Sequence, residues 1–453
     1  MKKAKPVLST IHIIMLSFLV VILIGSVLLA LPISTKSGNS VSYLDALFTA
    51  TTSTCVTGLV TLPTVTTWSW FGQIVILLLI QIGGLGLITI CAGIILALNK
   101  KFGLKESQLL QDAFNLNSLS GLASFVKRVL VGTVIVEGVG ALLYMFVFVP
   151  EFGFKGVWIS IFNSVSAFCN AGIDIVSENS LVSYATNPMI NAVTESLIVL
   201  GGLGYIVWWD VLRVLKQWKN LKWKCFQKLT LHSKIVLSAT AALVFGGAIC
   251  IFIFEYNNPL TIGNYSLFDK TQVSLFQSIT TRTAGFATIP QENLTNASAI
   301  LCLLLMFIGG SPVGTAGGIK TVTIIVLLAT AHSTIKNKNE VSLFNRNLPK
   351  QITRKAVAVT SMSFAIMFIS TILLAAVTTN ATALDIAYET VSATATVGLS
   401  RNFTSFVTNW GKIILIFTMY FGRVGPISLA FAFKSRKEVA DVIKNPTEDI
   451  SVG

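Results

Sequence analysis

The residues best suited to chemistry in this sequence are four glycines that end similar short motifs. The first is Gly58 in TCVTGL, and its counterparts are Gly172, Gly285 and Gly398. They are separated by 114, 113 and 113 residues, an even spacing over almost the whole chain. Glycine adopts backbone dihedrals that other residues avoid, so successive carbonyl oxygens of such a turn can face one point. Carbonyls that converge in this way can replace the hydration shell of a cation.

The other motifs do not indicate an enzyme. Six scattered cysteines include no C-x-x-C pair, so we interpret them as small hydrophobic residues. GTAGGIKT at 314–321 resembles a phosphate loop, but Ile319 replaces the required glycine and no strand precedes it. Carbonyls without fixed carboxylates suit a monovalent cation better than Ca²⁺. Asp174, which follows Gly172 closely, either enriches cations at the mouth of a pore or is a solvated loop acid.

The composition is that of a polytopic α-helical membrane protein. Hydrophobic residues make up 53% of the 453 residues and charged residues only 11%, and the mean hydropathy is +0.76. Soluble domains carry about 25% charged residues. Apolar runs of about 20 residues, long enough to cross a bilayer as helices, recur along the chain. Examples are 11–31, 74–98, 129–149, 235–254, 362–377 and 413–433.

The formal charge of +14 is distributed as in a membrane protein. Of the 33 lysines and arginines, 25 fall in five segments, 2–5, 100–128, 213–234, 336–355 and 434–444. The positive-inside rule places these segments, and with them both termini, in the cytoplasm. A basic face on anionic lipid therefore explains the charge better than nucleic-acid binding does.

The sequence around each glycine repeats as well. Ten residues before the glycines stand Phe48, Phe162, Leu275 and Tyr388. Each unit reads as a spanning helix, a half-helix of about a dozen residues that is too short to cross and must re-enter, a glycine turn and a second spanning helix. Four units predict eight spanning helices around one pseudo-four-fold pore, with the negative ends of the half-helices directed at its centre.

The repeats divide the chain into 1–99, 100–220, 221–335 and 336–440, followed by a cytoplasmic tail at 441–453. Asp45 and Asp385 occupy the same offset in the first and fourth repeats, where either can cap the short helix that follows. Small pairs such as the GGLG segments at 83–86 and 201–204 are accounted for by kinked helices that pack closely.

The four turns, TCVTGL, NAGI, TRTAGF and TVGL, resemble those of the Trk/Ktr/HKT superfamily of potassium transporters. LPIS at 31–34, LIQIGGLG at 79–86, GIKT at 318–321 and FGRVGP at 421–426 extend the resemblance over nearly the whole chain. The chain is most similar to the membrane subunit of bacterial Ktr-type systems.

The resemblance implies K⁺ uptake through one gated pore, and Gly58, where some Na⁺-preferring relatives have serine, favours K⁺. Na⁺ dependence is left open. It also implies a homodimer, no cofactor on this chain, and a cytosolic nucleotide-binding ring as partner, for which 213–234 and 336–355 are candidate docking loops. The implied filter comprises Cys55, Val56, Thr57, Gly58, Cys169, Asn170, Ala171, Gly172, Arg282, Thr283, Ala284, Gly285, Ala395, Thr396, Val397 and Gly398.

The third repeat is interrupted at 309–320, where five glycines and a proline cannot hold a regular helix. We expect a mobile loop across the pore rather than a kinked helix, and the resemblance implies a gate. Arg423 lies centrally in an apolar run, where the resemblance implies a pore-facing cation barrier and the alternative is a snorkelling side chain. The implied gate comprises Gly309, Gly310, Ser311, Pro312, Gly314, Thr315, Gly317, Gly318 and Arg423.

Arg282 is expected to point away from the ion, because a cation aimed into the pore would repel K⁺. Two other functions stay open. One is a channel of the same fold that discriminates weakly or prefers Na⁺. The other is a secondary transporter with alternating access, which the parallel rather than inverted repeats disfavour.

Overall fold

The computed structural model describes residues 10–98, 103, 107–111, 121–217, 222, 225–338 and 340–425. The basic segments 2–5 and 434–444 and the tail at 441–453 lie outside the described residues, as does the end of the predicted span at 413–433. The chain is mostly helical, as predicted. Within the described residues, two short antiparallel strands, β1 (Ser342–Leu343) and β2 (Arg346–Asn347), depart from the predicted all-α fold.

The helices fall into four groups, each with a long helix, a shorter one and a third. The first group is α1 (Thr10–Ala30), α2 (Tyr43–Thr54) and α4 (Trp70–Leu85), continued by α5 (Leu87–Ala97). The second is α7 (Leu122–Phe152), α8 (Phe154–Cys169) and α9 (Pro188–Leu203), continued by α10 (Tyr205–Leu215). The third is α13 (Leu231–Glu255), α14 (Leu267–Thr280), α15 (Asn296–Phe307) and α16 (Thr321–Ile335). The fourth is α17 (Lys350–Ala376), α18 (Ala383–Ala395) and α19 (Asn409–Val424).

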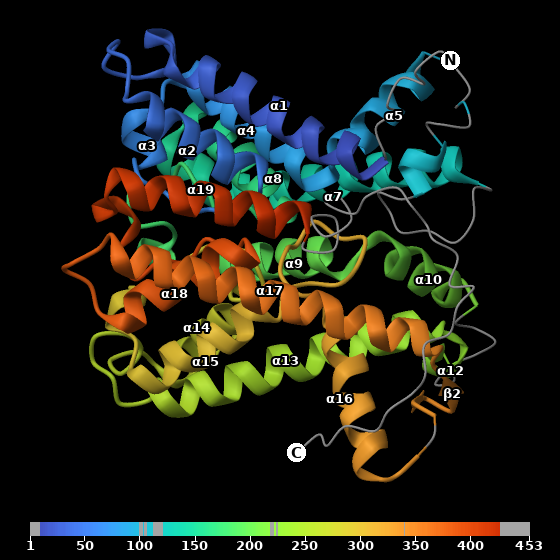
Figure 1. Cartoon of the computed structure of the whole chain (residues 1–453). Helices are drawn as coiled ribbons and strands as arrows, with labels where there is room; N and C mark the ends of the chain where they lie inside the picture. Colours follow the sequence, from blue (N-terminus) through green and yellow to red (C-terminus); the bar gives the residue numbers. More distant parts are fainter. Residues whose placement is uncertain are drawn as a thin grey trace, which may run out of the picture.

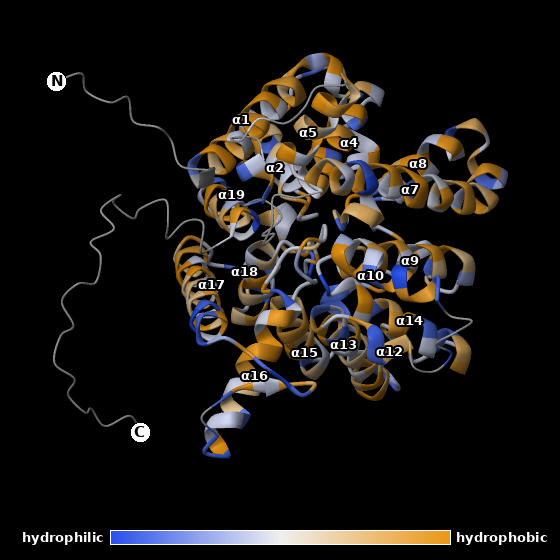
Figure 2. Cartoon of the chain, turned by 90° about the vertical axis from the view of Figure 1, so that its right-hand side faces the viewer, coloured by the Kyte–Doolittle hydropathy of each residue, from blue (hydrophilic) through white to orange (hydrophobic). Residues whose placement is uncertain are grey.

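Short elements connect these helices. They are η1 (Pro32–Ser34), α3 (Thr64–Thr67), η2 (Val182–Tyr184), α12 (Cys225–Lys228), η4 (Gln291–Asn293) and η5 (Thr404–Phe406). In each group the long helix packs against the shorter one that follows it. Figure 1 shows the long helices running roughly side by side, and Figure 2 shows the four groups around a common centre.

Among the described residues, four helices are long and apolar enough to cross a membrane: α1, α7, α13 and α17. Two bent pairs raise the number to as many as six. The chain is therefore a multi-pass membrane protein, and the predicted count of eight stays a prediction.

Both GGLG segments mark sharp bends. The axis turns by 94° between α4 and α5 and by 100° between α9 and α10. Gly86 and Gly204 stand at these breaks with φ of 81° and 85°, a conformation that glycine adopts without strain. The predicted kinks are thus confirmed at both segments, but the run at 74–98 is not the single straight span that its length suggests.

The short central helices are rich in buried hydroxyls, and several of these bond back to their own helix. Thr51 Oγ1 donates to the Leu47 carbonyl at 2.7 Å and Ser53 Oγ to the Thr49 carbonyl at 2.6 Å in α2, and α18 shows the same pattern. Such bonds satisfy hydroxyls that have no access to water.

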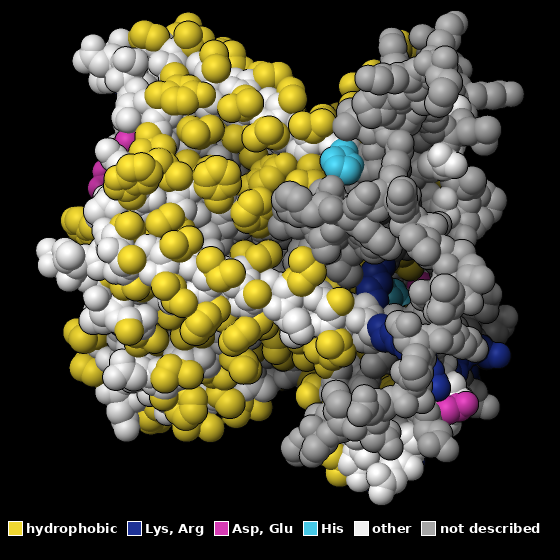
Figure 3. All heavy atoms as spheres, in the orientation of Figure 1, with side chains coloured by type: hydrophobic (Ala, Val, Ile, Leu, Met, Phe, Trp, Pro, Cys, Tyr) yellow, Lys and Arg dark blue, Asp and Glu magenta, His cyan; other side chains and the backbone are white. Residues whose placement is uncertain are grey.

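The surface separates apolar and charged side chains. Hydrophobic side chains cover the face formed by α1, α19, α17 and α13, and lysines and arginines gather at the end near α10 and α12 (Figure 3). Side chains such as Val134, Phe146 and Phe245 are more than 60% exposed on the long helices. An apolar belt of this kind belongs in a bilayer.

Candidate functional site

The four glycines that the sequence singles out meet at one point. Each of these glycines faces a backbone carbonyl oxygen of the following turn, namely that of the residue just before its glycine. The fourth glycine faces the corresponding oxygen of the first turn. A Cβ atom on any of the first three would lie 2.5 Å from that oxygen, and one on Gly398 would also overlap it. The facing pairs are Gly58 with Ala171, Gly172 with Ala284, Gly285 with Val397, and Gly398 with Thr57. The turns therefore form a closed arrangement of four glycines and four carbonyls, which we name the glycine ring.

The backbone follows the same unusual path in all four turns. The glycines have φ between 65° and 97°, and the residues two positions earlier have φ between 51° and 64°. Those earlier residues are Val56, Asn170, Thr283 and Thr396. Three of them are β-branched, and a positive φ strains such residues by about 1–3 kcal/mol each. Strain of this kind persists only where the surroundings fix the backbone, and it concentrates at functional sites.

Hydroxyl groups of the short helices hold the first and fourth turns in the same way. The amide of Gly58 donates to Thr52 Oγ1 at 3.0 Å, and the amide of Gly398 donates to Ser392 Oγ at 2.9 Å. In both turns the hydroxyl lies six residues before the glycine, on the helix that leads into the turn. The ring is thus fixed to the ends of α2 and α18.

The short helices α2, α8, α14 and α18 all end next to the ring. The carbonyl end of a helix carries about half a negative charge, so four such ends favour a cation between them. Three of the four predicted filter segments begin at such a helix end. Their first residues, Cys55, Cys169 and Ala395, are buried there.

Glycines of the small pairs let the next helix approach these ends. A Cβ atom on Gly83, Gly201 or Gly422 would overlap the carbonyl oxygen four residues before the turn glycine. The third repeat differs, because Gly309 faces the carbonyl of Gly317 in its own loop.

The loop at 309–320, between α15 and α16, lies against the ring. Thr315 Oγ1 donates to the carbonyl of Phe168 at 2.9 Å, and the amide of Gly317 donates to Thr283 Oγ1 at 3.1 Å. Its first half bonds to the end of α9, where the amide of Ser311 donates to the Gly202 carbonyl at 2.9 Å. The predicted gate residues therefore hydrogen-bond to the second and third turns, and Gly317 also packs against Thr396 of the fourth.

Arg423 connects this loop to the first group. Its guanidinium donates to the carbonyl of Thr315 at 2.7 Å and to that of Gly83 at 2.5 Å. Arg423 and Gly83 line a cavity of about 630 Å³ that also includes Lys320 and Ala395. Lys320 donates to the Ala316 carbonyl at 2.6 Å. Lys355 also lines the cavity, so three basic side chains, Lys320, Lys355 and Arg423, border it.

A second cavity of about 280 Å³ lies on the other side of the ring, and all four turn glycines line it. Asp174 lines it too and accepts a hydrogen bond from the amide of Val176 at 3.1 Å. Burial raises the pKa of Asp174 to about 6. The carboxylate is still mostly ionised at neutral pH and adds negative charge to this cavity, together with Glu178 and Glu292.

Two further charged residues lie close to the ring. The Arg282 guanidinium donates to Thr240 Oγ1 on α13 at 3.3 Å, so its charge is directed away from the ring. Glu137 is a buried acid of α7. Its carboxylate accepts from Gln81 at 3.2 Å and lies 3.8 Å from Cys169 Sγ, directly behind the second turn.

The two equivalent aspartates differ in their roles. Asp385 belongs to a capping box with Thr382 at the start of α18, which confirms the predicted cap. The same prediction for Asp45 was wrong, because the N-cap of α2 has no side-chain hydrogen bond. Asp45 instead forms an ion pair with Lys412 Nζ at 2.6 Å, across to α19.

Comparisons with known proteins agree on one family. A family model described as a cation transport protein, TrkH, matches residues 7–441. Ktr system potassium uptake protein B from Bacillus subtilis is 38% identical over 98% of this chain and 96% of its own length. The potassium/sodium uptake protein NtpJ from Enterococcus hirae is 37% identical over 100% of this chain and 99% of its own length.

A solved structure has the same fold. The potassium transporter TrkH from Vibrio parahaemolyticus matches with a TM-score of 0.75 at 16% identity, over 96% of this chain and 87% of that chain.

Proposed function

The chain belongs to the TrkH family of cation transport proteins, and we propose that it is the membrane subunit of a Ktr-type system that takes up K⁺ through the glycine ring. The observation that carries the proposal is the closed ring itself. Four backbone carbonyls face it, and the four turns around it share one backbone path. Carbonyl oxygens are the ligands with which K⁺-selective pores replace water.

In this proposal the four turns are the selectivity filter, and the loop at 309–320 together with Arg423 is the gate. The ring lies between an outer cavity with acidic residues and an inner cavity lined by three basic side chains, Lys320, Lys355 and Arg423. Positive charge beneath a filter opposes the passage of K⁺. For ions to pass, the loop must leave the ring and break the bonds from Thr315 to Phe168 and from Arg423 to Thr315.

The proposal includes four repeats with eight spans in the cell membrane and both termini in the cytoplasm. The four helix groups support the repeats, because each supplies one helix that ends at the ring. Lysines and arginines at the end near α10 and α12 support that orientation under the positive-inside rule (Figure 3).

We also propose a homodimer and a cytosolic nucleotide-binding ring as partner, with no cofactor on this chain and Na⁺ as a candidate activator. The relatives named as parts of a Ktr system support a regulatory partner in general. The exposed basic side chains near α12 and the β1–β2 hairpin form the natural docking face for it.

A Na⁺-permeable pore is the second candidate. One relative is named for both potassium and sodium uptake, and the four sides of the ring are chemically unequal. A filter with four unequal sides should discriminate less sharply between ions of different size than a filter with four identical sides.

Uptake of ⁸⁶Rb⁺ into proteoliposomes tests the proposal. The purified chain is reconstituted as wild type and as Arg423→Ala, in which the loop loses its cationic tie, beside liposomes without protein. We expect uptake that K⁺ inhibits more strongly than Na⁺. Equal inhibition by the two ions favours the second candidate, and the lack of uptake in both variants contradicts a pore.

A further inference from the structure

The fourth turn of the glycine ring has charged residues at two positions where the other three turns have uncharged ones. Arg401 stands three residues after Gly398, and Glu389 stands nine residues before it. At the position of Arg401 the other turns have Thr61, Ile175 and Thr288. At the position of Glu389 they have Thr49, Asn163 and Phe276. A buried charge is costly unless it is paired, so both residues need specific partners.

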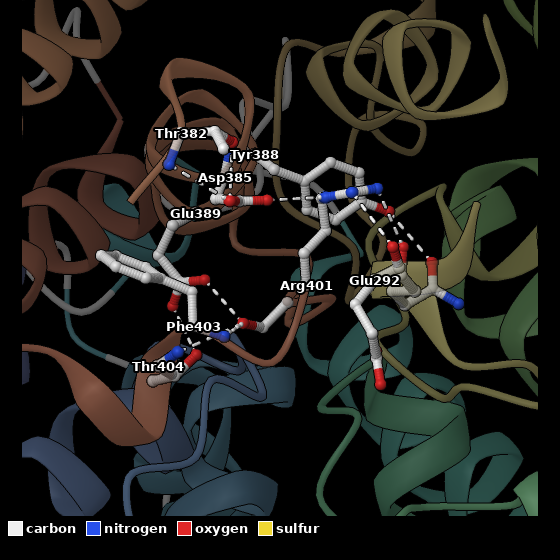
Figure 4. Close-up of polar contacts among 10 residues, drawn as sticks. Glu292, Thr382, Asp385, Tyr388, Glu389, Arg401, Phe403 and Thr404 are labelled. Carbon is white, nitrogen blue, oxygen red and sulfur yellow. Dashed lines mark hydrogen bonds and ion pairs between the residues drawn. The ribbon is translucent and has the colours of Figure 1, made fainter. Parts of the chain in front are cut away.

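Arg401 finds three partners, shown in Figure 4. Its Nε donates to Asp385 Oδ1 at 2.8 Å, and its two terminal nitrogens donate to the backbone carbonyls of Gln291 and Glu292, both at 3.1 Å. The Arg401 side chain is 12% exposed and that of Asp385 is 23% exposed. The planar guanidinium satisfies three acceptors at once, which a lysine ammonium on a flexible chain does not reproduce.

These partners come from two different helix groups. Asp385 lies in the first turn of α18, where its other oxygen accepts from Thr382 in the capping box. The carbonyls of Gln291 and Glu292 belong to η4, in the loop that leaves the third turn of the ring. Arg401 therefore links the exit of the fourth turn to the start of its own short helix and to the third group.

The third-group end of this link is itself fixed. The side-chain amides of Gln291 and Gln277 exchange hydrogen bonds at 2.6 Å and 3.1 Å, and Gln277 belongs to α14. The Tyr388 hydroxyl of α18 donates to Gln291 Oε1 at 3.0 Å. Gln277, Gln291 and Tyr388 are all buried. The backbone that Arg401 holds is thus tied to both short helices.

Glu389 supports the same segment from behind. Its two oxygens accept from Ser400 Oγ at 2.7 Å and from Thr404 Oγ1 at 2.5 Å, and the residue is fully buried. Ser400 Oγ in turn accepts from the amides of Phe403 and Thr404 at 3.1 Å and 3.3 Å. Hydrogen bonds therefore fix the segment that follows Gly398. Arg401 sets the position of this segment relative to the third group.

We propose that Arg401 is a positioning residue for ion selectivity, because it fixes the fourth turn of the ring against the third. These two turns meet in the ring, where Gly285 faces the carbonyl of Val397. The distance between them is one dimension of the opening through which an ion passes. The inference rests on the proposed function, in which this ring is the filter.

The test measures selectivity in proteoliposomes that contain the full chain. The readout is a ratio of two concentrations, that of Na⁺ and that of K⁺ at which each ion halves ⁸⁶Rb⁺ uptake. It is measured for wild type, Arg401→Gln, Arg401→Lys and Asp385→Asn. Lys412→Gln is the matched control, because it breaks another half-buried ion pair of the fourth group, Lys412 with Asp45, on the side facing the first group.

We expect Arg401→Gln to reduce the preference for K⁺ by about tenfold, equivalent to about 1.4 kcal/mol. Arg401→Lys and Asp385→Asn should each reduce the preference for K⁺ by less, because some of the hydrogen bonds of Arg401 or its replacement remain. Lys412→Gln should keep the wild-type preference. If Arg401→Gln does not fold, the two milder variants still decide the question.

Two results would overturn the inference: a wild-type preference in all variants of Arg401 and Asp385, or an equal loss in Lys412→Gln, which would indicate general loosening of the outer face. A wild-type protein that does not prefer K⁺ would instead contradict the proposed function, whatever the variants do.

Discussion

Replacing Gly58 by serine is the most direct perturbation of the glycine ring, since it adds a side chain where two turns meet. Gly58 has a φ of 97°, and a Cβ atom there would lie 2.5 Å from the carbonyl oxygen of Ala171. It would also lie 3.2 Å from the Cα of Gly398 and 3.3 Å from that of Gly172. The new atom therefore meets backbone on three sides, and no flexible side chain can move aside for it.

The magnitude follows from these values. Ordinary contacts begin at 3.4 Å, so the Ala171 oxygen must move by 3.4 − 2.5, or about 0.9 Å. A left-handed conformation adds about 1–2 kcal/mol for a residue with a side chain. A penalty of that size disfavours the closed ring relative to a widened one by about 5- to 30-fold. Since the displaced oxygen is a proposed ligand, we expect discrimination between K⁺ and Na⁺ to fall by about tenfold, the middle of that range.

Competition by K⁺ and Na⁺ against ⁸⁶Rb⁺ uptake measures this effect, and two glycines serve as controls. Gly38 has a φ of 73° with no atom within 4 Å of its Cβ position, so Gly38→Ser has backbone strain without a collision. Gly246 lies in α13 and has open space without a positive φ, so Gly246→Ser has neither. Both variants should keep the wild-type discrimination.

The reciprocal variant makes the test stricter. Gly398→Ser collides with the carbonyl of Thr57, which belongs to the first turn, and it should therefore reduce discrimination as Gly58→Ser does. If Gly58→Ser discriminates as well as Gly246→Ser does, the ring is not the filter and the reasoning fails.

Three further predictions concern the two cavities. Thr315→Val removes the bond to the Phe168 carbonyl, worth about 0.5–1.5 kcal/mol, and should raise ⁸⁶Rb⁺ uptake by the isolated chain several-fold; unchanged uptake would argue against the loop as gate. Arg423→Gln should raise uptake more than Arg423→Lys, which keeps the charge in the inner cavity; equal rates would assign the block to geometry alone. Asp174 is ionised above its pKa of about 6, so wild-type uptake at low Rb⁺ concentration should fall as the pH drops through 6, and Asp174→Asn should be low at neutral pH and lack this step.

The elements that form the ring could be predicted from the sequence. The spacing of the glycines located the turns, and the apolar runs located the long helices because a helix that crosses lipid needs about 20 predominantly apolar residues. The GGLG segments predicted close packing, and the Cβ positions at Gly83 and Gly201 explain it physically, since each glycine touches the carbonyl at the end of a short helix.

The partners of the charged residues were not predictable in this way. Asp45 and Asp385 have the same offset and the same chemistry, yet Asp45 pairs with Lys412, 367 positions away, and Asp385 pairs with Arg401. Ion pairs depend on which helices become neighbours, and local sequence carries little information about that. Glu137 illustrates the same point, since its partners Gln81 and Cys169 come from α4 and α8.

The four repeats can differ from one another because they belong to one chain, in which each repeat has its own sequence. Because the ring is cyclic, each turn supports the carbonyl of one neighbour, and a change in one turn reaches the next. In an assembly of four identical chains, a loop such as 309–320 would occur four times and an arginine such as Arg401 would have four copies. Here the third group carries the loop at 309–320, and the fourth group carries Arg401, which links it to the third. Gly317 of the loop bonds to Thr283 of the third turn and packs against Thr396 of the fourth. In the proposed function, a movement of this loop therefore starts beside the turn that Arg401 holds in place. Selectivity during gating should therefore be most sensitive at the contact of Gly285 with Val397, because the loop and Arg401 both act on the third and fourth turns that meet there.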